Sequence, residues 1–371
     1  MKNIKKSAFA LAGALALTLT ACSSNGASTG ASSSAAEGAA SGSAASSLSG
    51  TLNGAGASTQ QNAQQAWRDG FTATNSGVQV NYDPTGSGTG REKFLGGSVQ
   101  YAGSDDPLKD DELAKVSNAC ATDKIVELPV YISPIAVAYN LPGVDDLNLD
   151  ADTIAKIFSG KITKWNDPAI AATNKGVDLP DTDIIPVNRA DKSGTTGNFT
   201  GYLSEAAPDA WSYGSVEVWP ESGTQSAEGT SGVVNLAAGT EGAITYADYS
   251  QIGDLKAAKV KAGDEFLAPT ADAAAKIVDS SDDAAGASDT ILTKDLKRDG
   301  SIAGAYPVVL VSYEIGCQQY KNASDGELVK SYFTYVVSQE GQKAATDAGA
   351  GNAPISDALR EKAMAAINTI K

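Results

Sequence analysis

Short apolar runs alternate with stretches of helical periodicity from residue 50 to the C-terminus. Short apolar runs bounded by glycine and polar residues are typical of buried strands, and their alternation with helices predicts an α/β architecture. Prolines interrupt the longest apolar run, 125–141, so we expect two strands there. The other expected strands are 51–57, 78–82 and 306–315.

Apolar residues at helical spacing occur between these runs. Residues three or four apart lie on one helical face, so each such set is expected to pack against a sheet. The expected helices are 58–74 (with Ala63, Trp67 and Phe71 on one face), a helix from 91 onward, 149–160 (Ile154, Ile157 and Phe158) and 357–370 (Leu359, Ala363, Ala366, Ile367 and Ile370).

The N-terminus has the order of an export signal. Three lysines among the first six residues precede the apolar run 8–19, which is too short to span a bilayer. The following LTAC, residues 19–22, resembles the lipobox of bacterial lipoproteins, in which Cys22 receives the lipid and becomes the first mature residue. We therefore expect removal of 1–21, export, and a lipid anchor at the outer face of the bacterial cell membrane. The alternative is an ordinary cleaved signal with an incidental cysteine.

Residues 22–50 are expected to form a flexible tether. Ser, Ala and Gly fill 24 of the 28 positions from 23 to 50, so this segment has too few apolar side chains to form a core. The globular part then begins near residue 50. The whole chain of 371 residues is long enough for about two domains.

The composition excludes several kinds of chemistry. The formal net charge is -16, and removal of the three signal-segment lysines takes it to -19, which argues against binding to nucleic acid. The chain has no histidine, which removes Ser-His-Asp and Cys-His catalysis and most zinc ligation. We expect neither a metal nor a cofactor.

Cys120 and Cys317 either pair in an oxidising compartment or remain as buried thiols.

Three loops of one kind follow expected strands and open expected helices. They are GAGAST (54–59), GSGTG (86–90) and SGTTG (193–197). The first turn of a helix has unpaired N–H groups and a partial positive charge, so three such turns aimed at one point would bind an anion. Each loop alone also fits a capping turn, with Ser58 or Thr59 as the N-cap in the first.

Charged residues stand out next to these loops. Arg189 lies four residues before Ser193, and a guanidinium oriented by Asp191 offers paired donors suited to an oxyanion. The alternative for Arg189 and Asp191 is a surface ion pair. Asp105, in YAGSDDPL (101–108), follows an expected short strand, and the alternative there is an exposed turn before a proline.

Taken in order, these motifs resemble the phosphate-binding protein of the Pst-type ABC importer over nearly all of residues 50–371. The phrase GKITKWNDPAI is highly specific, and it lies between the SDDP and SGTT motifs. The matching segments are GAGAST, NYDPTGSGTGREKFLGGSVQYAGSDDPL, PVYISPIAVAYNLPGV, IAKIFSGKITKWNDPAI and VNRADKSGTTGNFTGYL. The resemblance implies a two-lobe periplasmic-binding-protein fold of type II, in which two hinge-crossing strands join α/β lobes that close on the ligand.

The resemblance also implies lobe boundaries and ligand contacts. Lobe I would comprise 51–140 plus 307–371 and lobe II 141–306, with crossing strands near Ala138 and Val309. The implied phosphate contacts are Ser58, the amide of Thr59, Ser87 and Asp105 from lobe I, and Arg189, Ser193, the amide of Gly194 and Thr195 from lobe II, with Asp191 beside Arg189.

The chain departs from the family pattern at three positions. Thr59 and Gln60 stand where the family usually has an aromatic residue and a proline, and Gly197 stands where an aromatic residue is often found. The backbone donor at 59 survives such changes, but the apolar wall around the ligand is expected to differ.

Several classes of function remain to be weighed. A hydrolase using Ser193 needs a base, and without histidine only the neighbouring Lys192 is available. An adhesin or scaffold that has lost binding predicts damaged loops, and these are intact. We therefore expect a monomeric solute-binding protein, not an enzyme, that delivers inorganic phosphate to ABC importer permease subunits.

The alternative ligand is another oxyanion, sulfate or molybdate. Asp105 should separate these ligands, because phosphate carries a proton that a carboxylate accepts and sulfate does not.

Overall fold

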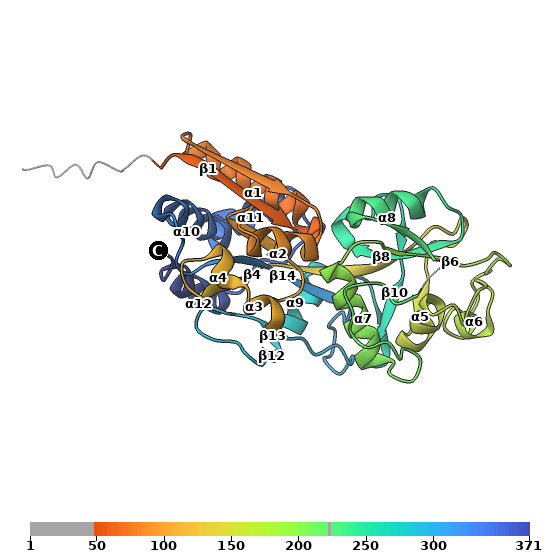
Figure 1. Cartoon of the computed structure of the whole chain (residues 1–371). Coiled ribbons are helices and arrows are strands. Elements are labelled where there is room, and N and C mark those ends of the chain that lie inside the picture. The colour runs from red at the N-terminus through yellow and green to blue at the C-terminus, as the bar shows by residue number, and fades with distance from the viewer. Residues whose placement is uncertain (1–47, 222–223) are drawn as a thin grey trace, which may run out of the picture. The chain divides into compact units, whose positions relative to one another are not determined.

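The computed structural model describes residues 48–221 and 224–371 (Figure 1), so the predicted signal segment, Cys22 and most of the tether lie outside the described residues. The helices are α1 (Gln61–Thr74), α2 (Ser87–Leu95), α3 (Asp110–Leu113), α4 (Val116–Ala119), α5 (Ala151–Phe158), α6 (Pro168–Thr173), α7 (Gly194–Ala206), α8 (Gly229–Ala238), α9 (Ala271–Asp279), α10 (Ala323–Val337), α11 (Gln339–Asp347) and α12 (Asp357–Ile367), with 3-10 turns η1 (Ser58–Gln60) and η2 (Tyr249–Gln251). The strands are β1 (Gly50–Gly56), β2 (Val78–Asp83), β3 (Tyr101–Ser104), β4 (Ile125–Tyr139), β5 (Asn148–Leu149), β6 (Ile185–Arg189), β7 (Gln225–Ala227), β8 (Ala243–Asp248), β9 (Lys256–Ala257), β10 (Lys259–Ala262), β11 (Glu265–Leu267), β12 (Asp282–Asp283), β13 (Lys294–Asp295) and β14 (Val309–Cys317).

Two groups of strands share the long strand β4. In the first group, β2, β1, β3, β14 and β4 are hydrogen-bonded in that order, with β1 parallel to its neighbours and β14 antiparallel to β3 and β4. In the second, β4 pairs with β8, followed by β6 and β7. Figure 1 shows α1, α2, α10 and α12 around the first group and α5, α7 and α8 around the second. The predicted α/β class with two lobes is therefore confirmed.

The prediction of two strands in 125–141 is wrong. β4 is one strand of 15 residues, and all of them are buried. Pro129 lies beside a register irregularity in the pairing with β14, and Pro134 is the last residue paired with β14 before β4 pairs with β8. Proline lacks the N–H of a ladder bond, so it is tolerated at a bulge and where a strand changes partner.

The other predicted elements are present with shifted ends. The apolar face residues expected for the three periodic helices are buried. α1 begins only at Gln61, after the 3-10 turn η1, so neither Ser58 nor Thr59 is its N-cap. The helix expected from 91 already begins at Ser87. The last helix ends at Ile367, and Ile370 is buried beyond its end.

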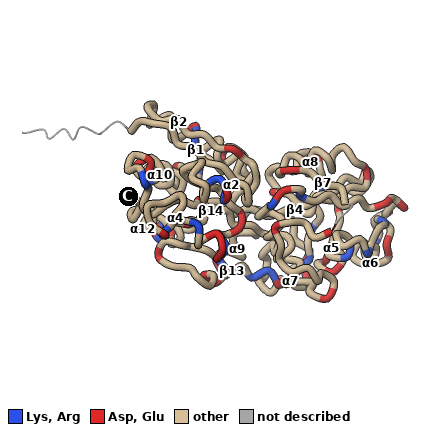
Figure 2. The backbone as a smooth tube through the Cα atoms, viewed as in Figure 1, with Lys and Arg blue, Asp and Glu red and all other residues tan. Residues whose placement is uncertain are grey.

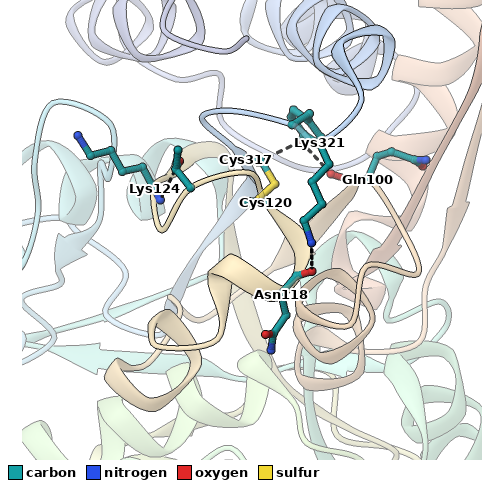
Figure 3. The surroundings of a disulfide bond; sticks show 8 residues. Gln100, Asn118, Cys120, Lys124, Cys317 and Lys321 are labelled. Carbon is teal, nitrogen blue, oxygen red and sulfur yellow. Dashed lines mark hydrogen bonds between the residues drawn. A yellow bond between two sulfur atoms is a disulfide. The ribbon is translucent and has the colours of Figure 1, made fainter.

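Cys120, just before β4, and Cys317, at the end of β14, are joined in a disulfide (Figure 3). Nearby, Lys321 Nζ donates to the carbonyl oxygen of Asn118 at 2.5 Å. The two cysteines are 197 residues apart in the sequence, so the bond closes a loop that contains the whole second lobe. In the chain-entropy account, a cross-link over so long a loop stabilises a fold by about 5 kcal/mol.

The segment 282–296 lies against the first lobe, although the boundary implied by the resemblance places it in lobe II. Leu292 N donates to the carbonyl oxygen of Glu127 on β4 at 2.8 Å, and Lys294 N donates to Tyr313 Oη on β14 at 3.2 Å. The backbone of this segment therefore follows the first lobe's strands.

Charged residues of both signs are spread over the two lobes (Figure 2). Within residues 48–221 and 224–371, no helix combines the length and apolarity needed to cross a bilayer. The same residues contain no group of three or more acidic or cysteine side chains placed to hold a metal ion.

Candidate anion-binding site

Asp105 lies where the two lobes meet, directly after the last residue of β3. Only 3% of its surface is exposed. Thr59 Oγ1, from the loop after β1, donates to its Oδ1 at 2.6 Å, and Thr195 Oγ1, from the first turn of α7, donates to its Oδ2 at 2.9 Å. The first lobe provides Thr59 and the second Thr195, so one carboxylate is bonded from both sides. The alternative of an exposed turn at Asp105 is wrong.

Arg189, at the end of β6, is held by Asp191. Its Nε and Nη2 donate to the two carboxylate oxygens at 2.7 and 2.5 Å, and its Nη1 lies 3.4 Å from Thr195 Oγ1. The side chains of Arg189 and Asp191 are 2% and 11% exposed, so this is a buried pair and not a surface one. Burial alone would raise the pKa of Asp191, but the bonds and charge of Arg189 and the amide of Gly229 hold it below its ordinary value.

The three predicted serines lie in the same region. Ser87 Oγ accepts from the amide of Asp105 at 3.1 Å. Ser58 Oγ accepts from the amide of Thr230 at 3.0 Å and lies 2.9 Å from its hydroxyl oxygen, so it also faces the second lobe. Ser193 is the N-cap of α7 and accepts from the amide of Thr196 at 3.2 Å. The three serines to which the loop motifs point therefore lie together at the junction of the two lobes.

Gly194 permits the close approach of the lobes. A Cβ atom at this position would lie 2.8 Å from Asp105 Cβ, from the amide nitrogen of Asp106 and from Ser87 Oγ. Real Cβ contacts are essentially never shorter than 3.0 Å, so any side chain here would push the start of α7 away from the first lobe. The amide of Thr196 is capped by Ser193, and the amides of Gly194 and Thr195, at the start of α7, have no partner within the helix and therefore offer donors beside Asp105.

A fourth loop of the same kind was missed. The segment EGTSG (228–232) follows β7 and opens α8. Gly229 N donates to Asp191 Oδ1 at 3.1 Å, and Thr230 bonds to Ser58. Its small hydroxyl and glycine residues carry the signal used for the other three loops, but the three-residue strand β7 is too short to be recognised as the start of a strand–loop–helix unit.

Two ion pairs connect the lobes beside this site. Arg91 Nη2 on α2 donates to both carboxylate oxygens of Glu217 at 2.8 Å, and Lys192 Nζ lies 2.9 Å from Glu112 Oε1. Arg91 Nε also bonds to Glu112 Oε2 at 2.9 Å. Each lobe therefore contributes one cation and one carboxylate, and the structure shows the lobes in contact. Nothing in the sequence pattern distinguished these residues from ordinary surface charges.

The chemistry of the site is that of an oxyanion receptor. Hydroxyl groups, helix N-termini and one guanidinium supply donors, while Asp105 supplies an acceptor. Burial raises the pKa of Asp105, and hydroxyl bonds from Ser312, Thr59 and Thr195 together with the Arg189 charge oppose that rise. Lys192, the base that a hydrolase using Ser193 would need, pairs with Glu112 at 2.9 Å.

The class of protein follows from this fold and from a family comparison. A model of the PBP superfamily domain, the periplasmic-binding-protein class, matches residues 35–340. A phosphate-binding protein from Stenotrophomonas maltophilia of known structure is similar, with a TM-score of 0.67, 22% identity, and coverage of 85% of this chain and 94% of that one. At this identity the likeness shows the fold.

Relatives of closer sequence define the family. Phosphate-binding protein PstS 3 of Mycobacterium tuberculosis is 36% identical over 320 residues, which cover 85% of each chain. Phosphate-binding protein PstS of Pasteurella multocida is 31% identical over 306 residues, covering 79% of this chain and 83% of the relative. The chain belongs to the PstS family of phosphate-binding proteins.

Proposed function

We propose that this protein captures inorganic phosphate between its two lobes and presents it to the permease subunits of an ABC importer. The observation that carries the proposal is the bonding of one buried carboxylate, Asp105, by Thr59 from the first lobe and Thr195 from the second. A ligand with oxygens to accept from the nearby amides and guanidinium and a proton to give to the carboxylate fits that arrangement. The names of the family members support the same ligand.

The proposed phosphate contacts are Ser58, the amide of Thr59, Ser87, Asp105, Arg189, Ser193, the amide of Gly194 and Thr195, with Asp191 orienting Arg189. We assign 51–140 and 307–371 to lobe I and 141–306 to lobe II, with 282–296 attached to lobe I through its contacts. Phosphate binds donors of one lobe and recruits those of the other, so it favours the closed state by its greater affinity for that state. The protein acts by binding alone and not as an enzyme.

Asp105 favours phosphate over sulfate or molybdate. Phosphate near neutral pH carries a proton, which the carboxylate accepts in a charge-assisted hydrogen bond. Sulfate has no proton, so its oxygens would face the carboxylate lone pairs unpaired, and mismatches of this kind give discrimination on the order of 10⁴.

The test of this proposal is a pair of matched variants titrated with phosphate and sulfate at fixed salt. Asp105→Asn removes the repulsion and supplies an amide donor, so sulfate binding should improve while phosphate binding falls. Asp106→Asn removes the neighbouring carboxylate, which pairs with Lys109, and should leave the preference for phosphate over sulfate unchanged. If Asp105→Asn rejects sulfate as firmly as the parent protein, Asp105 does not select the ligand.

The protein is also proposed to be an exported, monomeric lipoprotein. The lipobox LTAC with Cys22 supports this proposal, and the extracytoplasmic site of action of such binding proteins agrees with it. Cys22→Ser should move the protein from the membrane fraction to the soluble fraction in bacteria that express it, and the released protein should sediment as a single chain. Retention of Cys22→Ser in the membrane fraction would rule out the lipid anchor at that residue.

A further inference from the structure

A chain of buried side-chain hydrogen bonds ends on Asp105. Ser312 on β14 donates from Oγ to Asp105 Oδ1 at 2.6 Å. Gln60 Nε2, from η1, donates to Ser312 Oγ at 2.7 Å, and Gln64 Nε2, on α1, donates to Gln60 Oε1 at 2.8 Å. Behind them, Tyr332 Oη donates to Gln64 Oε1 at 2.9 Å. Gln60, Gln64 and Ser312 are all fully buried.

The direction of the protons in this chain is fixed by its neighbours. Gln60 Nε2 also donates to the carbonyl oxygen of Tyr313 at 3.2 Å. A carbonyl oxygen only accepts, so the NH₂ group of Gln60 is the one that faces Ser312. Ser312 Oγ therefore accepts from Gln60 and directs its own hydrogen at Asp105. A hydroxyl that already accepts a hydrogen bond is a stronger donor, so the chain is polarised toward the carboxylate.

The two oxygens of Asp105 are not equivalent. Oδ1 accepts from both Thr59 and Ser312 at 2.6 Å, which fills its two lone-pair positions. Oδ2 accepts only from Thr195, at 2.9 Å, among the side chains described. The remaining acceptor position, to which a ligand would donate its proton, is therefore on Oδ2.

Few other charges act on Asp105. The guanidinium of Arg189 favours its ionised form, and Asp191 is engaged by Arg189. Asp106 is paired with a surface lysine. Burial raises the pKa of Tyr82 well above its ordinary value, so this phenol is uncharged near neutral pH. At the far end of the chain Glu314 Oε1 accepts from Gln64 Nε2, and burial raises the pKa of this carboxyl group well above its ordinary value. Against this background, the hydroxyl bonds are the main opposition to the cost of burying an ionised Asp105.

We propose that Gln60 and Ser312 are positioning residues for ligand selection. They contact no ligand in the proposed site, but their hydrogen bonds keep Asp105 ionised and help to fill the acceptor positions of its Oδ1. An ionised Asp105 repels unprotonated oxyanions. With these bonds Asp105 stays ionised at a lower pH than it would without them, so the site rejects such oxyanions over a wider pH range. This proposal rests on the proposed function of phosphate capture. It also gives a role to Gln60, a position at which this chain departs from the family pattern.

The test is the pH at which sulfate begins to bind. Sulfate does not change its protonation between neutral and mildly acidic pH, so the onset of its binding reports a group of the protein. In the parent protein, sulfate binding should be absent at neutral pH and appear as Asp105 becomes protonated. Ser312→Ala removes a direct donor to the carboxylate and should move this onset about one to two pH units higher. Gln60→Met removes only the polarising donor and should move it less, by about half a unit.

The matched control is Gln65→Met. Gln65 is exposed on α1, the helix that follows Gln60, and its side chain bonds only to Arg68 and Asp69, so this substitution changes the same chemical group without affecting the chain of hydrogen bonds. Its sulfate onset should coincide with that of the parent. All variants are made in the chain from residue 22 with Cys22→Ser, and phosphate is titrated at neutral pH beside sulfate.

The outcomes separate the two proposals. A raised sulfate onset in Ser312→Ala and Gln60→Met, with phosphate affinity changed only a few-fold and the control unmoved, supports the positioning role. An onset equal to the parent's in both variants, or loss of phosphate binding in variants that remain folded by circular dichroism, overturns it. If the parent protein binds no phosphate, the proposed function fails, and the positioning role fails with it.

Discussion

The ion pair between Arg91 and Glu217 should contribute to phosphate affinity although neither residue belongs to the proposed site. Arg91 is on the first lobe and Glu217 on the second, so the pair exists only when the lobes are in contact. Opening would separate the two groups, whereas in this structure their side chains are 0% and 8% exposed. The substitution Glu217→Gln should therefore weaken the closed state specifically.

The size of the loss in phosphate affinity depends on the hydrogen-bond partners that Arg91 retains in Glu217→Gln. Removing one partner of a buried ion pair costs about 3–5 kcal/mol. Arg91 retains Glu112 at 2.9 Å and Ser104 at 2.8 Å, and the glutamine side chain can still accept one hydrogen bond. We therefore expect a loss of about 2 kcal/mol, which is about thirtyfold in phosphate Kd. Lys192→Met removes the companion pair, but Lys192 is 35% exposed, so a loss of only a few-fold is expected.

The assay is calorimetric titration with phosphate, and Glu221→Gln is the matched control. Glu221 is in the same loop as Glu217 and bonds to Tyr213 of the same lobe, so its substitution removes an equal charge without affecting a contact between lobes. Glu221→Gln should bind like the parent. If Glu217→Gln binds phosphate as tightly as Glu221→Gln does, the lobes do not close on phosphate as this structure shows them.

Further substitutions probe the remaining parts of the site. Arg189→Ala should weaken phosphate binding by a few kcal/mol, because charge-assisted bonds contribute about 1.5–3 kcal/mol each. Arg189→Lys should recover part of the loss in the same titration. If Arg189→Ala binds phosphate like the parent, Arg189 does not belong to the site. Gly194→Ala should lower phosphate affinity at least as much, since the added Cβ meets Asp105, and an unchanged affinity would show that the lobes do not approach so closely. Intact mass after alkylation without reductant should show Cys120 and Cys317 unmodified, and two alkylated thiols would exclude their disulfide.

Local sequence patterns predicted the α/β class and some of the strands and helices, and they pointed to several residues of the proposed site. Alternation of apolar runs and helical periodicity predicted the α/β class, because each lobe repeats the same strand–loop–helix unit. The recurring small-residue loops pointed to Ser58, Ser87 and Ser193. The continuous strand β4 was not predictable, because a local pattern does not reveal that Pro129 and Pro134 lie where the pairing changes.

Residues that act through long-range contacts were not predictable from local patterns. Ser312 is a single polar residue in an apolar strand, and it bonds to Asp105 across 207 positions of sequence. Gln60 lies beside a recognised loop, but its partner is 252 positions away. Arg91 and Glu217 resemble ordinary charged residues until the fold buries them between the lobes. Spacing along the chain carries no information on such pairs, because the fold alone brings them together.

Selective capture of phosphate can be measured by calorimetric titration of the unlipidated chain. Residues 22–371 with Cys22→Ser are titrated with phosphate, sulfate and molybdate at neutral pH and one salt concentration. We expect one phosphate to bind per chain, with sulfate and molybdate weaker by at least about a hundredfold, because Asp105 requires a protonated ligand. Absence of phosphate binding, or sulfate or molybdate binding as tightly as phosphate, would contradict this expectation.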